Sequence, residues 1–196
     1  MSISKSQQKR HAVQGAAGKL AAQGADIPSA PVDPALEIVA FMEQIAVARR
    51  AIINGQLPIE RQDIPTMEEF VLRHALPARR GSVLPAGVPM DQPKDCYRNA
   101  AHLAIANPGY TYCEGYAIRN SLPLPIQHAW VVDGIGRVID STWSEPERCQ
   151  YLGVPFSRDE LVRELTLNGV YGLLDTGRGM NIALVVRISA ERAGRS

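Results

Sequence analysis

The sequence predicts an α+β fold, in which helices come first and a mostly antiparallel sheet follows. Three early segments carry helical apolar spacing or capping signals: 34–54, 67–75 and 95–106. Three later segments carry strand-like patterns: 110–118, 127–133 and 137–140. A chain whose helices and strands are separated in this way is typical of α+β proteins.

Composition is that of an ordinary globular protein. The chain has 196 residues, a hydrophobic content of 45% and a formal net charge of +1. This length suits one domain, which we assign to 34–190, between a flexible polar arm (1–33) and a short tail (191–196). The near-neutral charge gives no reason to expect nucleic acid or an anionic membrane as a partner. No apolar run approaches the roughly 18–20 residues of a membrane helix.

Cysteine usage and the N-terminus predict a cellular compartment. The chain has three cysteines, and an odd number does not suggest a disulfide scaffold. Residues 1–10 are polar and lack the apolar region of a secretory signal. We therefore expect a cytoplasmic protein whose thiols stay reduced.

The first two helices are expected to be scaffold. Asp33 can cap the first helix, and Gly55 suits its end. Thr66 and Glu69 have the spacing of a capping box, which predicts where the second helix begins.

A long loop is predicted between the second and third helices. Residues 77–94 contain four prolines and two glycines, which disfavour regular structure. The third helix follows, with Asp95 as its N-cap and Asn107 just past its end. A long loop in this position can form one wall of a substrate groove.

The rest of the chain is predicted to complete the sheet. A tight turn at 134–136 joins two strands, 127–133 and 137–140, as a hairpin. Further elements are expected at 151–154 (a strand), 157–168 (a helix opened by a capping box and ended by Gly169) and 182–188 (a last strand).

Cys96 is the first candidate for chemistry because it stands at the start of the third helix. Free N–H groups and the dipole at a helix N-terminus stabilise a thiolate, the nucleophilic form of cysteine. A free cysteine is, however, more often a small buried apolar residue. Its position alone leaves both interpretations open.

His128 and Asp140 favour the catalytic interpretation. Alternation along the strand places His128, Trp130 and Val132 on one face. The predicted hairpin returns Asp140 beside His128 on the neighbouring strand. A carboxylate held against one imidazole nitrogen would orient the ring and leave the other nitrogen for the thiol.

Four motifs in this order resemble the core of transglutaminase-like enzymes, which belong to the broader papain-like group. They are Cys96 at a helix start, Glu114-Gly115-Tyr116-Ala117, His128-Ala129-Trp130 and Asp140-Ser141-Thr142-Trp143. The resemblance implies a helix that bears the nucleophile and packs on a mostly antiparallel sheet. It also implies that Cys96 attacks an amide or ester carbonyl, that His128 is the acid and base, and that Asp140 orients His128. Asp-Ser-Thr-Trp stands here where Asp-Pro-Thr-Trp is common in that group.

The oxyanion of such a reaction needs hydrogen-bond donors. The backbone N–H of Cys96 is a natural donor, because a helix N-terminus presents free amides. Gln92 is a second candidate, since it lies near the place where papain-like enzymes supply a side-chain amide. Asn99, one turn along the helix, is assigned a surface or packing role.

Three more residues are expected around the site. Trp130 and Trp143 would form apolar walls that keep His128 dry. Glu114 either lines the cleft or is a solvated or salt-bridged carboxylate.

No metal site or cofactor is predicted. Cys113 and Cys149 lack CxxC partners, and neither HExxH nor a paired-histidine spacing occurs.

Together these patterns predict a thiol-dependent hydrolase or acyltransferase that acts on amide bonds of a protein or peptide substrate. Peptide hydrolysis is the favoured outcome, while deamidation or acyl transfer to an amine would use the same three residues. Two alternatives stay open: a binding protein that keeps the fold without turnover, and a zinc-dependent hydrolase that uses the same cysteine and histidine.

Overall fold

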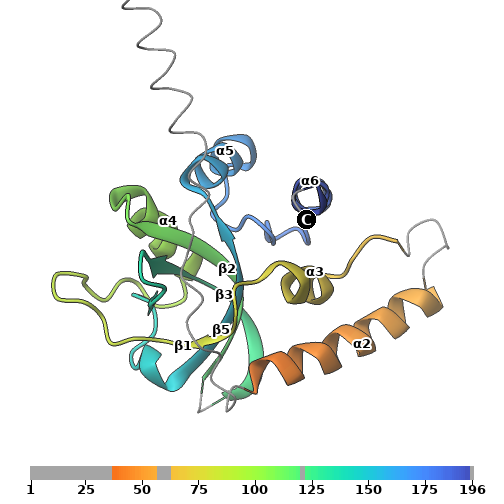
Figure 1. Cartoon of the computed structure of the whole chain (residues 1–196), viewed down its shortest axis with the longest axis horizontal. Coiled ribbons are helices and arrows are strands. Elements are labelled where there is room, and N and C mark those ends of the chain that lie inside the picture. The colour runs from red at the N-terminus through yellow and green to blue at the C-terminus, as the bar shows by residue number, and fades with distance from the viewer. Residues whose placement is uncertain (1–36, 57–62, 120–121, 195–196) are drawn as a thin grey trace, which may run out of the picture.

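The computed structural model describes residues 37–56, 63–119 and 122–194. Within them, five α-helices accompany a five-stranded sheet whose strand pairs are antiparallel, which confirms the predicted α+β class (Figure 1). The expected arm (1–33) and the Asp33 cap lie outside the described residues. No helix in the described ranges combines the length and the apolar content needed to cross a membrane.

The element bounds follow the prediction closely in the middle of the chain. The helices are α2 (Ile38–Gln56), α3 (Met67–His74), α4 (Cys96–Ala106), α5 (Arg158–Asn168) and α6 (Ile182–Ala193). The strands are β1 (Arg79–Arg80), β2 (Tyr110–Arg119), β3 (Leu122–Asp133), β4 (Val138–Ile139) and β5 (Cys149–Phe156), with a 3-10 turn η2 (Pro146–Arg148) before β5. In the sheet they follow the order β1-β5-β2-β3-β4.

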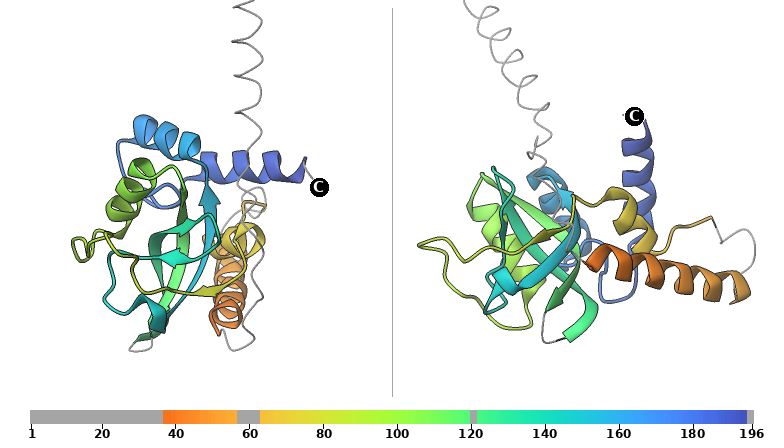
Figure 2. Two further views of the ribbon diagram at one scale, coloured as in Figure 1. Left: turned by 60° about the vertical axis from the view of Figure 1, so that its left-hand side comes forward. Right: turned by 60° about the horizontal axis from the view of Figure 1, so that its bottom comes forward.

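Helices α2, α3, α4 and α6 contribute to one apolar cluster together with strand residues of a single face of the sheet. Figures 1 and 2 show α4 next to β2 and β3, apart from α2 and α3. The chain between β1 and α4 projects from the sheet near α4 in every view. The predicted long loop therefore lies near the helix that carries Cys96.

The predicted capping boxes are confirmed at the starts of α3 and α5. The Thr66 hydroxyl accepts a hydrogen bond from the N–H of Glu69, and the Glu69 carboxylate accepts one from the N–H of Thr66. Ser157 and Glu160 make the same reciprocal pair at the start of α5. Gly169 ends α5 in the left-handed conformation, with φ at 67°, as expected of a C-terminal glycine.

Close strand packing around the site depends on two glycines. Gly115 lies opposite His128 in the β2–β3 register, and a Cβ atom there would lie 2.4 Å from the carbonyl oxygen of Leu152. A Cβ on Gly153 would lie 2.5 Å from the ring of Trp130. Both positions therefore need a residue without a side chain.

The sheet separates two apolar clusters, as the alternation along β3 predicted. Ala129 and Val131 belong to the main core, which α2, α3, α4 and α6 also enter. Trp130 and Val132 face a smaller cluster that contains Trp143 and Tyr151. His128 shares the face of Trp130 and so lies at the smaller, aromatic cluster.

The predicted strand at 182–188 is wrong, because this segment is the start of helix α6. The side chain of Asn181 caps the helix by accepting a hydrogen bond from the N–H of Leu184 at 3.2 Å. The buried residues Leu184, Val185 and Ile188 have helical rather than alternating spacing. The helix continues to Ala193, three residues into the expected tail.

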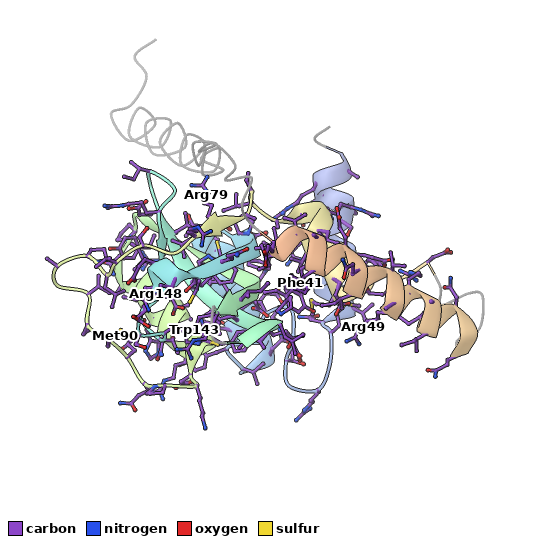
Figure 3. All side chains as sticks on the ribbon, turned by 90° about the horizontal axis from the view of Figure 1, so that it is seen from below. Phe41, Arg49, Arg79, Met90, Trp143 and Arg148 are labelled. Carbon is purple, nitrogen blue, oxygen red and sulfur yellow. The ribbon has the colours of Figure 1, made fainter. Side chains whose placement is uncertain are left out.

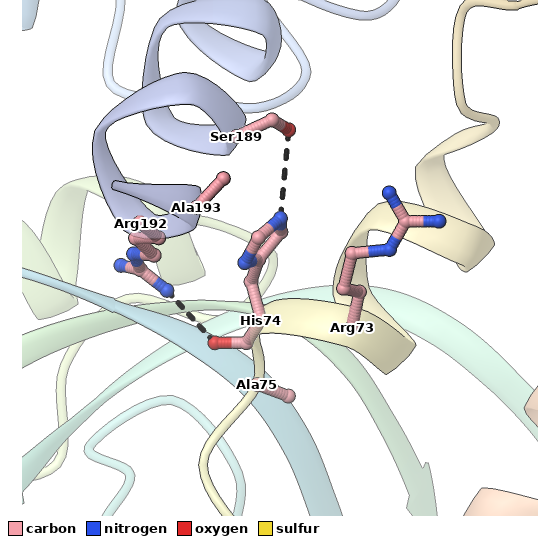
Figure 4. A pocket seen from close by; sticks show the side chains of 6 residues that line it. All are labelled: Arg73, His74, Ala75, Ser189, Arg192 and Ala193. Carbon is pink, nitrogen blue, oxygen red and sulfur yellow. Dashed lines mark hydrogen bonds between the residues drawn. The ribbon is translucent and has the colours of Figure 1, made fainter. Parts of the chain in front are cut away.

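Polar contacts fix α6 against the end of α3. Arg192 donates to the backbone carbonyls of His74, at 2.9 Å, and of Pro155, at 3.0 Å. The Ser189 hydroxyl lies 3.5 Å from Nε2 of His74 (Figure 4). These residues line a hollow of about 460 Å³ that includes no residue of the predicted triad. A cation at the carbonyl end of a helix is favourable, so we assign this cluster to helix packing.

Candidate active site

Cys96, His128 and Asp140 come together from three separate elements. Nε2 of His128, on β3, lies 2.8 Å from Oδ2 of Asp140, which directly follows β4. The same imidazole also lies close to the thiol of Cys96, the first residue of α4, and this contact contributes to raising the pKa of His128. The side chains of His128 and Asp140 are 2% and 1% exposed, so water does not compete for their contact. The structure therefore assembles the three predicted residues in the order thiol, imidazole, carboxylate.

The start of α4 leaves its N-terminal amides free of a side-chain cap. Asp95 occupies the N-cap position, but its side chain makes no capping hydrogen bond, contrary to the prediction. The Asp95 carboxylate lies instead 3.6 Å from the guanidinium of Arg98. Lys94, just before it, has a φ of 66°, which is uncommon for a residue other than glycine. The backbone turns sharply here and presents the N–H groups at the helix start next to the thiol.

Asp140 is held by donors on both carboxylate oxygens. The N–H of Thr142 donates to Oδ1 at 2.8 Å. The hydroxyl of Tyr151, from β5, donates to Oδ2 at 2.9 Å, the same atom that His128 contacts. No local pattern in the sequence indicates Tyr151, because its contact with Asp140 joins segments that are not neighbours in the sheet. The carboxylate is thus fixed in position by hydrogen bonds to both of its oxygens.

His128 is protonated more readily than an ordinary histidine. Burial opposes its protonation, but the contacts with Asp140 and Cys96 outweigh burial and raise the pKa of His128 to about 9. The imidazole therefore carries a positive charge at neutral pH.

Aromatic rings enclose the imidazole. Trp143 stacks on His128 with ring centroids 4.1 Å apart and an interplanar angle of 22°. Trp130 lies nearly parallel to the same ring at 6.3 Å. Trp143 lies at the end of the molecule that also carries Met90, whereas Phe41 and Arg49 of α2 lie towards the other end (Figure 3). The two tryptophans thus occupy the positions expected of walls around His128.

Asn99 links two segments of the candidate site, although the sequence predicted only a surface or packing role for it. It is buried on α4, one turn after Asp95, and its side-chain amide donates two hydrogen bonds. One goes to the backbone carbonyl of Gln92 at 2.8 Å and the other to the hydroxyl of Thr142 at 3.0 Å. A single amide thereby ties the loop before Cys96 to the segment that carries Asp140. A buried polar residue inside a helix was the signal that could have indicated this role.

Gln92 lies where the sequence placed it, in the loop before α4, with an exposed side chain. Its backbone is held by Asn99, so the residue has a defined place near the start of the helix. The role of its side-chain amide as an oxyanion donor stays a prediction.

Glu114 is not a solvated or salt-bridged carboxylate, which was one of the two expectations for it. It is 2% exposed, and its carboxylate accepts hydrogen bonds from three successive backbone amides, at Leu173, Leu174 and Asp175. The Tyr112 hydroxyl donates a fourth at 3.0 Å. Burial raises the pKa of Glu114 to about 7 although these donors favour the anion. Glu114 is therefore an anchor for the segment 173–175, and the expectation of a solvated or salt-bridged carboxylate was wrong.

The other two cysteines lie on strands rather than at a helix start. Both are free and buried, Cys113 on β2 and Cys149 at the start of β5. Burial raises the pKa of the thiol in both residues. Among the described residues, no group of three or more His, Cys, Asp or Glu side chains could hold a metal ion.

Comparisons of the chain with protein-family models, with curated proteins and with solved structures found no match.

Proposed function

We propose that this protein is a thiol-dependent hydrolase or acyltransferase that acts on amide bonds, with a papain/transglutaminase-like core. Cys96 is the nucleophile, His128 the acid and base, and Asp140 the residue that orients His128. The observation that carries the proposal is the position of His128, whose Nε2 lies 2.8 Å from Asp140 and whose ring lies close enough to the Cys96 thiol for the thiol to help raise its pKa. This is the mutual geometry that an activated nucleophile requires.

The first half-reaction would form an acyl-enzyme. The Cys96 thiolate attacks the carbonyl carbon of the substrate, and negative charge develops on the carbonyl oxygen. The N–H of Cys96 at the start of α4, and the side chain of Gln92 as a second candidate, stabilise this oxyanion. The His128 imidazolium then gives its proton to the leaving nitrogen. The C–N bond breaks, the amine departs and a thioester remains on Cys96.

The second half-reaction would release the acyl group. Neutral His128 takes a proton from water, which attacks the thioester carbon and displaces the thiolate. The products are a carboxylic acid and the restored thiolate–imidazolium pair. Peptide hydrolysis is the favoured outcome because water suffices as the second nucleophile; an amine in its place would give acyl transfer, and a glutamine side chain as substrate would give deamidation. A cytoplasmic location, where free thiols stay reduced, fits the three free cysteines.

A thiol-labelling experiment tests this proposal. The native protein is treated with iodoacetamide at pH 7, and mass spectrometry follows the labelling of each cysteine over time. Cys96 should react faster than Cys113 and Cys149, and His128→Ala should remove that advantage. His102→Ala is the matched control, because His102 lies exposed on the same helix and contacts Tyr171 instead of the thiol. Equal labelling of the three cysteines in the native protein would contradict the proposal.

One observation favours a second candidate, a binding protein that has this fold without turnover. Cys96 is only 9% exposed, so access to its thiol is narrow. Cys96→Ala separates the two candidates. An enzyme should lose turnover while its stability barely changes, whereas a binding protein should keep its partner.

A further inference from the structure

Arg119, the last residue of β2, lies on the face of the sheet that carries His128. It is directly opposite Cys149 in the β2–β5 register, and Cys149 belongs to the aromatic cluster with Trp130 and Trp143. Side chains directly opposite each other in a sheet share a face. The side chain of Arg119 therefore points to the same side of the sheet as the imidazole.

The indole ring of Trp143 connects Arg119 to the candidate site. The guanidinium carbon of Arg119 lies 5.0 Å from the centroid of this ring. The same tryptophan stacks on His128, with ring centroids 4.1 Å apart. The guanidinium and the imidazole thus contact one common side chain. An extended substrate chain, which advances by about 3.3–3.6 Å per residue, would span the distance between them with about three residues.

The charge of Arg119 has no carboxylate partner in the described part of the chain. There the guanidinium contacts the ring of Trp143 and forms no ion pair. By contrast, Arg137 and Arg148 each pair with a neighbouring carboxylate. Asp140, the carboxylate of the site, already accepts hydrogen bonds on both of its oxygens. The positive charge of Arg119 is therefore available to a ligand.

The chemistry of this position suits a carboxylate. A guanidinium carries N–H groups around its edge that can donate two parallel hydrogen bonds to the two oxygens of a carboxylate. The contact with Trp143 restricts the Arg119 side chain, so less conformational freedom is lost when a ligand binds. Arg119 is also half-buried, which strengthens its attraction for an anion relative to that of a fully solvated cation.

We propose that Arg119 is a specificity-determining residue, which binds a carboxylate of the substrate close to the amide bond that Cys96 attacks. The inference rests on the proposed function, which supplies the reaction at Cys96. It adds the chemical class of the substrate: a peptide that carries an acidic side chain or a free terminal carboxylate within about three residues of the reactive bond.

Three peptide-like alkylating reagents test the proposal, because the thiolate of Cys96 displaces iodide from each of them. The neutral reference is the iodoacetyl derivative of alanyl-glutamine amide. The second reagent has glutamate in place of glutamine, and the third keeps glutamine but ends in a free carboxylate. Mass spectrometry gives the rate at which each reagent labels Cys96. The quantity compared between proteins is the rate with an acidic reagent divided by the rate with the neutral one.

Arg119→Gln removes the charge and should lower this ratio about three- to tenfold for at least one acidic reagent. The reagent affected shows whether Arg119 binds a side-chain or a terminal carboxylate. Arg119→Lys should keep part of the ratio, because it keeps the charge but not the two parallel donors. A purely structural role, in which Arg119 only supports Trp143, would change all three rates by the same factor and leave the ratios unaltered, which would overturn the proposal.

Arg148→Gln is the matched control. Arg148 directly precedes Cys149, the residue opposite Arg119, but its guanidinium already lies 3.1 Å from the carboxylate of Glu145. Removal of this paired charge should leave both ratios as they are in the native protein. A fall in Arg148→Gln equal to that in Arg119→Gln would mean that the general charge of this end of the molecule, and not Arg119, selects the reagent.

The outcomes separate this inference from the proposed function. If the neutral reagent labels Cys96 no faster than Cys113 and Cys149, the proposed function fails. If Cys96 is the fastest-reacting of the three cysteines but Arg119→Gln lowers neither ratio, the assignment of Arg119 alone is wrong.

Discussion

The hydroxyl of Tyr151 donates a hydrogen bond to Oδ2 of Asp140 at 2.9 Å. Nε2 of His128 contacts the same oxygen at 2.8 Å, so two donors share one carboxylate oxygen. Tyr151 also belongs to the aromatic cluster around the imidazole, with its ring centroid 6.2 Å from that of His128. Tyr151 is therefore a positioning residue, because it acts on His128 through Asp140.

Tyr151→Phe should raise the pKa of His128 further. Without the tyrosine donor, the charge on Oδ2 acts on His128 alone and stabilises the imidazolium more strongly. Titration of the His128 imidazole by NMR, in the native protein and in the variant, measures the change. A purely structural role for Tyr151 would lower the melting temperature and leave the pKa of His128 unchanged, which would contradict this prediction.

Protonation of His128 should make stability depend on pH. Its pKa is raised from 6.5 to about 9 in the folded protein, so the folded state holds the proton more tightly than the unfolded state. The stabilisation is fully present below pH 6.5 and is lost as pH rises towards 9. Urea unfolding of the native protein and of His128→Ala across this range measures it. The difference in unfolding free energy between the two proteins should shrink with rising pH; a constant or growing difference would argue against a raised pKa.

Asn99→Ala should affect both stability and reactivity. It removes two buried hydrogen bonds and leaves the carbonyl of Gln92 without this donor, at a cost of about 1–3 kcal/mol in unfolding free energy. The variant no longer links the loop before Cys96 to the segment that carries Asp140. The rate at which iodoacetamide labels Cys96, relative to Cys113 and Cys149, should therefore also fall. Asn107→Ala is the control, since Asn107 is exposed at the end of α4 and its side-chain amide donates to the nearby carbonyl of Leu103. Equal effects of the two substitutions would show that Asn99 has no special role.

Local patterns predicted the elements that local hydrogen bonds define. The capping boxes at Thr66 and Ser157 involve residues three positions apart, so their spacing is visible in the sequence. The hairpin between β3 and β4 is similarly short, and its turn brings Asp140 near His128. For this reason all three residues of the candidate triad could be named before the structure was known.

The strand expected at 182–188 shows where local patterns were insufficient. An apolar run of that length satisfies the spacing of a strand as well as that of a helix. The cap at Asn181 and packing of Leu184, Val185 and Ile188 into the main core decide for the helix. Whether the segment forms a helix or a strand therefore depends on the residues that pack around it in the folded protein.

The sequence by itself determined the order of thiol, imidazole and carboxylate along the chain and the short elements that carry them. Only the tertiary structure decided that Tyr151 and Asn99 hold this set in place and that Glu114 anchors residues 173–175. The physical reason is distance along the chain. Glu114 and Leu174 are 60 residues apart, and no local spacing records a contact that exists only when the sheet and the helices are packed.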